Sequence, residues 1–176
     1  MTVDGCTSTN DTVVVLASGR AGPPRSPDDL GRALAEACHG LAALMAADAE
    51  GGSKVVHVLV TGALSDDEAH RAARKVADSN LVKCSLNGED PYWGRVVSEL
   101  GSAGVGFETD AVEIGYGGTV VCRGGVAVDH DGSAVRTHMA QALVEIRCDL
   151  GLGEGRAVVM TTDLGHGYID ENRTTS

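Results

Sequence analysis

An almost unbroken apolar run, residues 55–60, lies between two segments whose apolar residues recur at helical spacing. Apolar residues at successive positions are typical of a strand that needs cover on both faces of its sheet. The helix before it is expected to begin at Ser26 with Pro27 in its first turn, and the helix after it at the capping box Ser65–Glu68. This alternation predicts an α/β (or α+β) fold, in which layered helices pack on mixed sheets.

The rest of the chain divides into two parts of different character. Residues 1–105 are expected to form a βαβαβα lobe, with further strands at 12–17 and 81–86 and a helix after Asp90-Pro91. Residues 106–176 are expected to form a strand-rich meander with one helix. Its expected strands are 112–116, 119–122, 126–128, 144–149 and 156–162, and its helix is 133–141. The last two strands are expected to pair as a hairpin across the glycine-rich residues 151–155, which lack the Lys-Ser/Thr of a phosphate-binding loop.

Composition excludes several classes of function. The 176 residues carry 14 Lys and Arg against 25 Asp and Glu, a net charge of -11, so phosphate backbones would repel the chain and no nucleic-acid partner is expected. No apolar run approaches the roughly 18 residues of a membrane span. The first residues do not resemble a signal peptide, so a cytoplasmic location is expected. The five cysteines contain no CxxC and the six histidines no HExxH, which disfavours a metal site.

Two polar features remain open from the residues alone. The stretch 4–11 is rich in hydroxyl and carboxylate groups and is either a capped turn or the wall of a site for an anion or amine. Glu50 is expected at the C-terminal end of the long helix that begins at Ser26 and ends at Gly51-Gly52, where the helix dipole is negative. A carboxylate there is either exposed and tolerated or retained to bind a cation.

Five ordered motifs, spread over the whole chain, resemble the ornithine acetyltransferase (glutamate N-acetyltransferase) family. The motifs are residues 4–12 (Asp-Gly-Cys-Thr-Ser-Thr-Asn-Asp-Thr), 48–54 (Asp-Ala-Glu-Gly-Gly-Ser-Lys), 81–83 (Leu-Val-Lys), 88–90 with 93–95, and 162–164 with His166 and Tyr168. Their order and spacing match the family, which is far more specific than any one motif. The resemblance implies an autoprocessed enzyme of the N-terminal-nucleophile type.

The resemblance also implies a mechanism. Such enzymes cleave their own precursor before a threonine, and the resulting α and β chains stay together. The new N-terminal threonine takes the acetyl group from N-acetylornithine and passes it to glutamate in a ping-pong reaction of arginine biosynthesis. Its own α-amine can act as the base, and an oxyanion hole from the α chain stabilises the tetrahedral intermediate.

The sequence departs from the family pattern at its beginning. In the family the nucleophile lies a few dozen residues before the Asp-Gly motif, whereas here only Met1-Thr2-Val3 precede it. We therefore expect this chain to be the C-terminal part of a β chain, with no catalytic residue of its own. The nucleophile and oxyanion hole are expected on other polypeptide, in an α2β2 heterotetramer or a larger assembly.

Family matches assign substrate contacts to Glu50 and Asn172 and to a hydroxyl at Thr175 or Ser176. A supporting set beside the site is expected at Thr7, Ser8, Thr9, Asn10 and Asp11. No metal or nucleotide cofactor is expected, and acetyl-CoA would serve as a substrate only in bifunctional members. Two alternatives stay open: an amide hydrolase or aminopeptidase of the N-terminal-nucleophile kind, and a non-catalytic interaction module.

Overall fold

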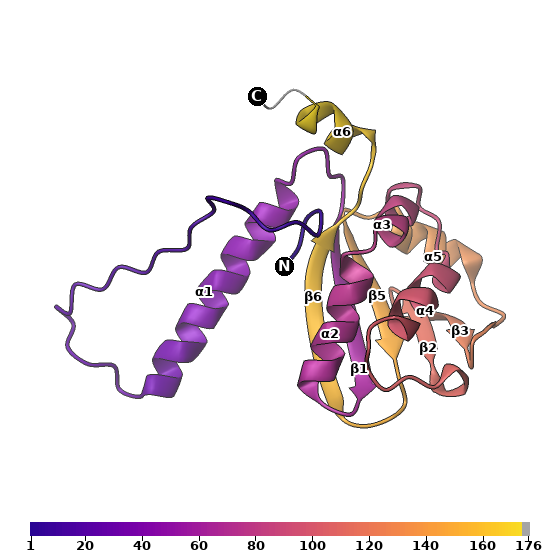
Figure 1. Cartoon of the computed structure of the whole chain (residues 1–176), viewed down its shortest axis with the longest axis horizontal. Coiled ribbons are helices and arrows are strands. Elements are labelled where there is room, and N and C mark those ends of the chain that lie inside the picture. Colours follow the sequence, from indigo (N-terminus) through magenta and orange to yellow (C-terminus); the bar gives the residue numbers. More distant parts are fainter. Residues whose placement is uncertain (174–176) are drawn as a thin grey trace.

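A computed structural model describes residues 1–173 of the chain. Within them, strands from both halves form one six-stranded sheet in the order β4-β3-β2-β5-β1-β6 (Figure 1). The strands are β1 Val55–Ala63, β2 Glu113–Tyr116, β3 Thr119–Arg123, β4 Val126–Ala127, β5 Leu143–Asp149 and β6 Gly155–Thr162. The helices are α1 Pro27–Ala47, α2 Asp66–Ala77, α3 Asn80–Asn87, α4 Trp93–Gly101, the short 3-10 helix η1 Thr109–Ala111, α5 Gly132–Met139 and α6 His166–Asn172. The expected layered α/β fold is confirmed.

Strand β1 lies between β5 and β6, and these three are the longest strands of the sheet. It pairs in parallel with β5 and antiparallel with β6, so that Val55 lies between Leu143 and Thr162. The expected hairpin between β5 and β6 is therefore wrong. The intervening turn instead passes the end of β1, where Leu152 N and Gly153 N donate to Gly62 O over 2.7 and 2.9 Å. The apolar strand β1 has two edges for pairing, and β5 pairs with one edge while β6 pairs with the other.

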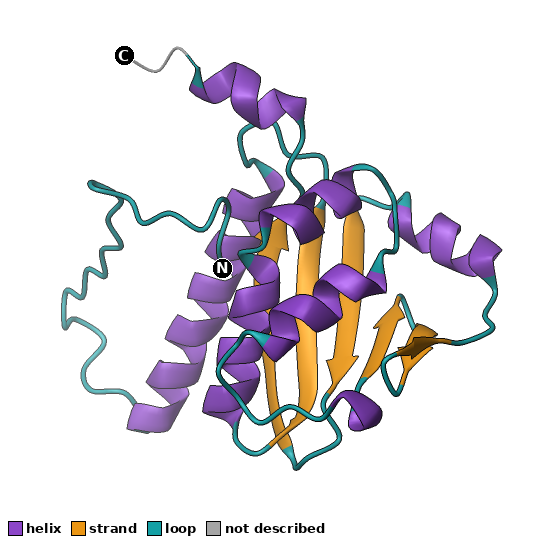
Figure 2. Ribbon diagram, turned by 45° about the vertical axis from the view of Figure 1, so that its right-hand side comes forward, coloured by secondary structure: helices purple, strands orange, loops and turns teal. Residues whose placement is uncertain are grey.

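Helices cover one face of this sheet (Figure 2). Helix α2 packs on β1 and β6, and α4 packs on α2 and β2. Residues of β1 alternate accordingly, because Val56, Val58 and Val60 are fully buried while their neighbours are only half-buried. The expected cover on both faces of β1 is thus not supplied by residues 1–173.

The expected strand at residues 81–86 is wrong, because this segment is helix α3. Ser79 caps the helix, its Oγ accepting from Val82 N over 3.4 Å. The buried side chains of α3 are Val82, Lys83, Ser85 and Leu86. Their spacing of three and four positions is that of one helix face, and a six-residue apolar run is too short to distinguish this from a strand.

The expected strand at residues 12–17 is also absent within the part of the chain described. This segment runs as extended coil, with Val13 83% and Leu16 91% exposed. It leads to α1, which stands beside the sheet at the left of Figure 1. Only Ala46 of this 21-residue helix is buried.

Candidate functional site

The motifs quoted from the sequence meet at one end of the sheet, where β1 begins and β6 ends. The N-terminal residues join this end because Thr2 N donates to Met160 O over 2.9 Å. Helix α3 joins it through Leu164 N, which donates to Lys83 O over 3.2 Å. Segments more than a hundred positions apart in the sequence therefore share one polar cluster, which we call the polar hub and which centres on Asp163 and Lys83.

Asp163 fixes the loop that precedes β1. Its carboxylate accepts hydrogen bonds from Ser53 N (2.7 Å), Ser53 Oγ (2.7 Å), Lys54 N (2.8 Å) and Asn87 Nδ2 (2.7 Å). Burial by itself would raise the pKa of Asp163, but these hydrogen bonds outweigh it and lower the pKa below its usual value. The residue is 3% exposed and acts as a structural clamp between the loop and α3.

Lys83 is the second centre of the polar hub and is fully buried. Its Nζ donates to the carbonyl oxygen of Val3, to Thr161 Oγ1 (3.0 Å) and to Thr162 Oγ1 (3.2 Å). Burial lowers the pKa of Lys83 to about 8, although nearby carboxylates such as Asp163 oppose the shift. Lys83 thereby ties the N-terminal segment to the end of β6. Sequence reasoning assigned Lys83 and Asp163 no role at the site; the available signal was their place inside the quoted motifs.

A second polar link holds helix α6. Tyr168 donates its hydroxyl to Asp4 Oδ2 over 2.8 Å, and Cys6 N donates to Asp4 Oδ1 over 2.8 Å. The bonds from Cys6 and Tyr168 lower the pKa of Asp4, and the bond to Asp4 raises the pKa of Tyr168 to about 12. The loop before β1 also contacts α6. Gly51 (φ +65°) lies so close to the backbone of Gly167 that a Cβ on residue 51 would collide with it. Helix α6 is therefore placed by the segments on either side of it.

Glu50 and Asn172, the two expected substrate contacts within the described residues, lie side by side. Asn172 Nδ2 donates to Glu50 Oε2 over 2.9 Å and to Tyr168 O over 3.0 Å. Helix α1 ends at Ala47, so Glu50 lies in the following loop rather than on the helix itself. Both side chains are exposed, which leaves their polar groups accessible to a ligand.

Among the described residues, no hydrogen bond joins the other expected residues to this pair. Thr7, Ser8, Thr9, Asn10 and Asp11 are exposed. Ser8 Oγ accepts from Asn10 N (3.3 Å) and Asp11 N (3.1 Å), as in a capped turn. Part of this stretch lines a groove of about 850 Å³ against α1, opposite Leu41 and Met45. Thr175 and Ser176 lie outside the described residues.

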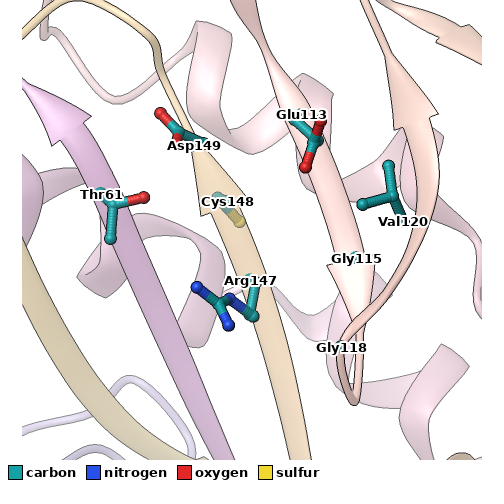
Figure 3. Close-up of a pocket in the computed structure, with 8 residues that line it drawn as sticks. All are labelled: Thr61, Glu113, Gly115, Gly118, Val120, Arg147, Cys148 and Asp149. Carbon is teal, nitrogen blue, oxygen red and sulfur yellow. The ribbon is translucent and has the colours of Figure 1, made fainter.

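A separate hollow of about 250 Å³ lies toward the other end of the sheet, on the face that helices leave open. Figure 3 shows the side chains around it, among them Glu113, Arg147 and Asp149. None of its lining residues belongs to the polar hub. Among residues 1–173, no three His, Cys, Asp or Glu side chains group as metal ligands would, and no helix is long and apolar enough to cross a membrane.

Comparison with known proteins identifies the class to which this fold and site belong. The structure superposes on the crystal structure of the arginine biosynthesis bifunctional protein argJ from Bacillus halodurans with a TM-score of 0.91 and 35% identity. The match covers 98% of this chain and 84% of that chain. The protein is thus a layered mixed α/β chain of the ArgJ type.

Sequence comparison agrees with the structural one. The model of the ArgJ family matches residues 1–174. Curated relatives, each called arginine biosynthesis bifunctional protein ArgJ, are 44% identical in Mycolicibacterium paratuberculosis and 42% identical in Zymomonas mobilis, over 99% and 98% of this chain. The chain belongs to the ArgJ family. It spans 42% of the length of the mycobacterial relative and 44% of that from Zymomonas.

Proposed function

We propose that this chain is the C-terminal part of the β chain of an autoproteolytic ornithine acetyltransferase. The enzyme moves an acetyl group from N-acetylornithine to glutamate in arginine biosynthesis, in the cytoplasm. The names of the ArgJ relatives support the pathway. The observation that carries the proposal is the 2.9 Å hydrogen bond between Asn172 and Glu50, which are 122 positions apart.

This pair suits an amino-acid substrate. Ornithine and glutamate both present an amino group and a carboxylate. The Glu50 carboxylate can accept from the amino group, and an amide such as Asn172 offers both a donor for the carboxylate and an acceptor. Charge-assisted hydrogen bonds of this kind are stronger than neutral ones, so the pair can orient the substrate as well as bind it.

In the proposed reaction, a threonine outside this chain attacks the acetyl carbonyl of N-acetylornithine. The threonine gives its proton to its own α-amine, and an acetyl-threonine ester forms as ornithine leaves with a proton. The amino group of glutamate then attacks the ester, which frees the threonine and yields N-acetylglutamate. The residues of this chain hold the amino acid in both half-reactions. No metal or cofactor takes part, and acetyl-CoA is a second acetyl donor if the enzyme is bifunctional.

We propose that the α chain of the same precursor completes the enzyme, as an α2β2 heterotetramer or a larger assembly. The lengths of the relatives support this division. This chain spans 84% of the crystallised Bacillus chain but 42% of the mycobacterial relative, so the former chain is about half as long as the latter. The exposed apolar side chains of α1 support a partner as well: Leu30, Leu34, Leu41, Leu44 and Met45.

The proposal is tested with Glu50→Gln and Glu50→Ala in the full processed enzyme. Loss of a charged acceptor is worth about 1.5–3 kcal/mol, so we expect KM for N-acetylornithine and for glutamate to rise about tenfold or more. Glu154→Gln, an exposed carboxylate between β5 and β6, is the matched control. Unchanged kcat and KM in both Glu50 variants would contradict the assigned role.

Product analysis separates the proposed transferase from the hydrolase alternative. The transferase forms N-acetylglutamate and, without an acceptor, stops at the acetyl-enzyme. A hydrolase releases acetate at the same rate whether or not glutamate is present. Repeating the assay with acetyl-CoA in place of N-acetylornithine decides whether the enzyme uses both donors.

A further inference from the structure

We propose that the hollow of about 250 Å³ on the open face of the sheet binds a free α-amino acid with a basic side chain. Arg147 holds the carboxylate of this ligand, and Asp149 and Glu113 hold its two positively charged groups. The hollow shares no lining residue with the Glu50–Asn172 pair, so the inference goes beyond the acetyl transfer proposed above.

Neighbouring strands build the hollow from two rows of residues on the open face. In one row, Asp149 of β5 has Thr61 of β1 and Glu113 of β2 as its register partners. In the next row, Arg147 of β5 has Gly115 of β2 as its partner. Rows on one face are two residues apart, which is about 7 Å along a strand. A row with two carboxylates and a guanidinium therefore line the same space from opposite ends (Figure 3).

Two glycines keep this space open. Gly115 contributes no side chain beside Arg147, and a Cβ at residue 115 would meet Thr119 O at 2.9 Å. Gly118 also lines the hollow and has nothing within 4 Å of the position of a Cβ. The hollow thus exists because two of its lining residues lack side chains. Concave sites with a few polar groups are the usual form of small-molecule sites in proteins.

The charged groups around the hollow do not satisfy one another. Among residues 1–173, Arg147 forms no ion pair. Asp149 uses Oδ1 to accept from Gly151 N over 2.9 Å, which leaves Oδ2 for a ligand. Glu113 uses Oε2 to accept from Arg123 Nη2 over 2.7 Å, which leaves Oε1. Asp149 and Glu113 are also register partners, and like charges directly opposite each other destabilise a sheet, so a cation between them is favourable.

A ligand that carries both signs of charge fits these groups. A simple anion would pair with Arg147 but meet the carboxylates of Asp149 and Glu113, and a metal ion would meet the guanidinium. An α-amino acid has a carboxylate and an ammonium group on one carbon, so it reaches both rows with charge-assisted hydrogen bonds. Two carboxylates face one guanidinium, so a second positive charge on the ligand, as in ornithine or arginine, completes the balance.

Isothermal titration calorimetry with L-arginine on the full processed enzyme tests the site. L-Arginine is the probe because it carries all three charged groups and is not a reactant of the proposed acetyl transfer. We expect saturable binding that weakens about tenfold or more in Arg147→Gln, since a charge-assisted hydrogen bond is lost. Arg136→Gln, at an exposed position on α5 outside the hollow, is the matched control and should bind as wild type does. Absence of saturable binding to wild type would overturn the proposal.

Two analogues of the probe test whether both ends of the ligand are recognised. Nα-acetyl-L-arginine lacks the α-ammonium group, and L-argininamide lacks the carboxylate. We expect each to bind wild type about tenfold or more weakly than L-arginine does. Arg147→Gln should weaken the binding of L-arginine but not that of L-argininamide, because the amide lacks the group that Arg147 holds. Equal affinities for the three compounds would contradict the assigned contacts.

The Glu50→Ala variant separates this site from the proposed substrate pair. We expect Glu50→Ala to bind L-arginine as wild type does, because Glu50 does not line the hollow. Binding that is lost in Glu50→Ala and kept in Arg147→Gln would assign L-arginine to the substrate pair and overturn the proposal. The calorimetric readout needs no turnover, so the amino-acid site and the acetyltransferase assignment can each fail while the other stands.

Discussion

The hydroxyl of Tyr168 donates to the carboxylate of Asp4 over 2.8 Å, across 164 positions of sequence. The same residue's carbonyl oxygen accepts from Asn172, whose amide also reaches Glu50. One tyrosine on α6 thus links the N-terminal segment to the pair proposed to bind substrate. None of the residues of α6 is buried in a core, so these polar contacts position the helix.

Removing the hydroxyl in Tyr168→Phe should weaken this link. We expect a loss of stability of about 1 kcal/mol, since one part-buried hydrogen bond is removed, and a higher KM at little changed kcat. Tyr92→Phe is the matched control, because Tyr92 is 52% exposed. A double-mutant cycle with Asp4→Asn, followed by urea unfolding, measures the coupling. Strictly additive effects would show that the two side chains do not act as a pair.

Gly51→Ala tests the close approach between the loop before β1 and α6. The new Cβ would meet the backbone of Gly167 and Tyr168, so α6 must move and Asn172 must leave Glu50. Gly104→Ala has a similar positive φ (+67° against +65°) but meets nothing within 4 Å. We expect about 1 kcal/mol of strain in the control and a clearly larger loss of stability and substrate affinity in Gly51→Ala. Thermal unfolding and KM measure both, and equal effects would contradict the contact.

Asp163→Asn should loosen the loop at residues 51–54. The amide cannot accept all of the hydrogen bonds that the carboxylate takes from Ser53, Lys54 and Asn87, so we expect a loss of about 2–4 kcal/mol. Asp129→Asn, at an exposed position, should change stability little. The lowered pKa of Asp163 means that its contribution is present above the unfolded value near 3.8 and is lost as the pH falls through the folded pKa. Urea unfolding at pH 7 and at pH 3 should show a smaller Asp163→Asn effect in acid.

Lys83→Met should also have an effect that depends on pH, in the alkaline range. The folded pKa of Lys83 is about 8, whereas an unfolded lysine keeps its proton up to its ordinary pKa of 10.5. Between these values the unfolded chain binds more protons, so Lys83 adds stability as the pH rises. We therefore expect the stability difference between wild type and Lys83→Met to grow from pH 7 to pH 9.5, measured by urea unfolding. Parallel stability curves for the two proteins would mean that the Lys83 pKa is not lowered by folding.

Local signals in the sequence predicted most helices and several strands correctly. The caps at Ser26 and Ser65 are confirmed, with side chains that accept from Asp28 N and Glu68 N. The strand expected at residues 81–86 is wrong because a short apolar run fits both the strand period and the helix period. The buried residues of α3, which include Lys83, have the spacing of a helix face. The partners of β1 were not predictable, since the choice between a local hairpin and a distant central strand depends on the packing of the whole sheet.

The candidate site was predictable in part. Glu50 and Asn172 were named from the family resemblance, and the fold brings them together. The polar hub was not predicted, because its bonds join segments that only the folded chain brings close, such as Lys83 with Val3 and Thr161. The strand expected at residues 12–17 is a different case, since its side chains carry the signal but residues 1–173 supply no backbone partner for it.

The position of β1 between β5 and β6 determines when this chain can fold. Strand β1 is made before both of its neighbours, residues 143–149 and 155–162. During synthesis, β1 therefore waits with two open edges until residue 162 has left the ribosome, and its contacts span about ninety to a hundred residues. Long-range pairing of this kind slows folding. Any maturation step that requires the finished sheet must then wait until residue 162 has been made.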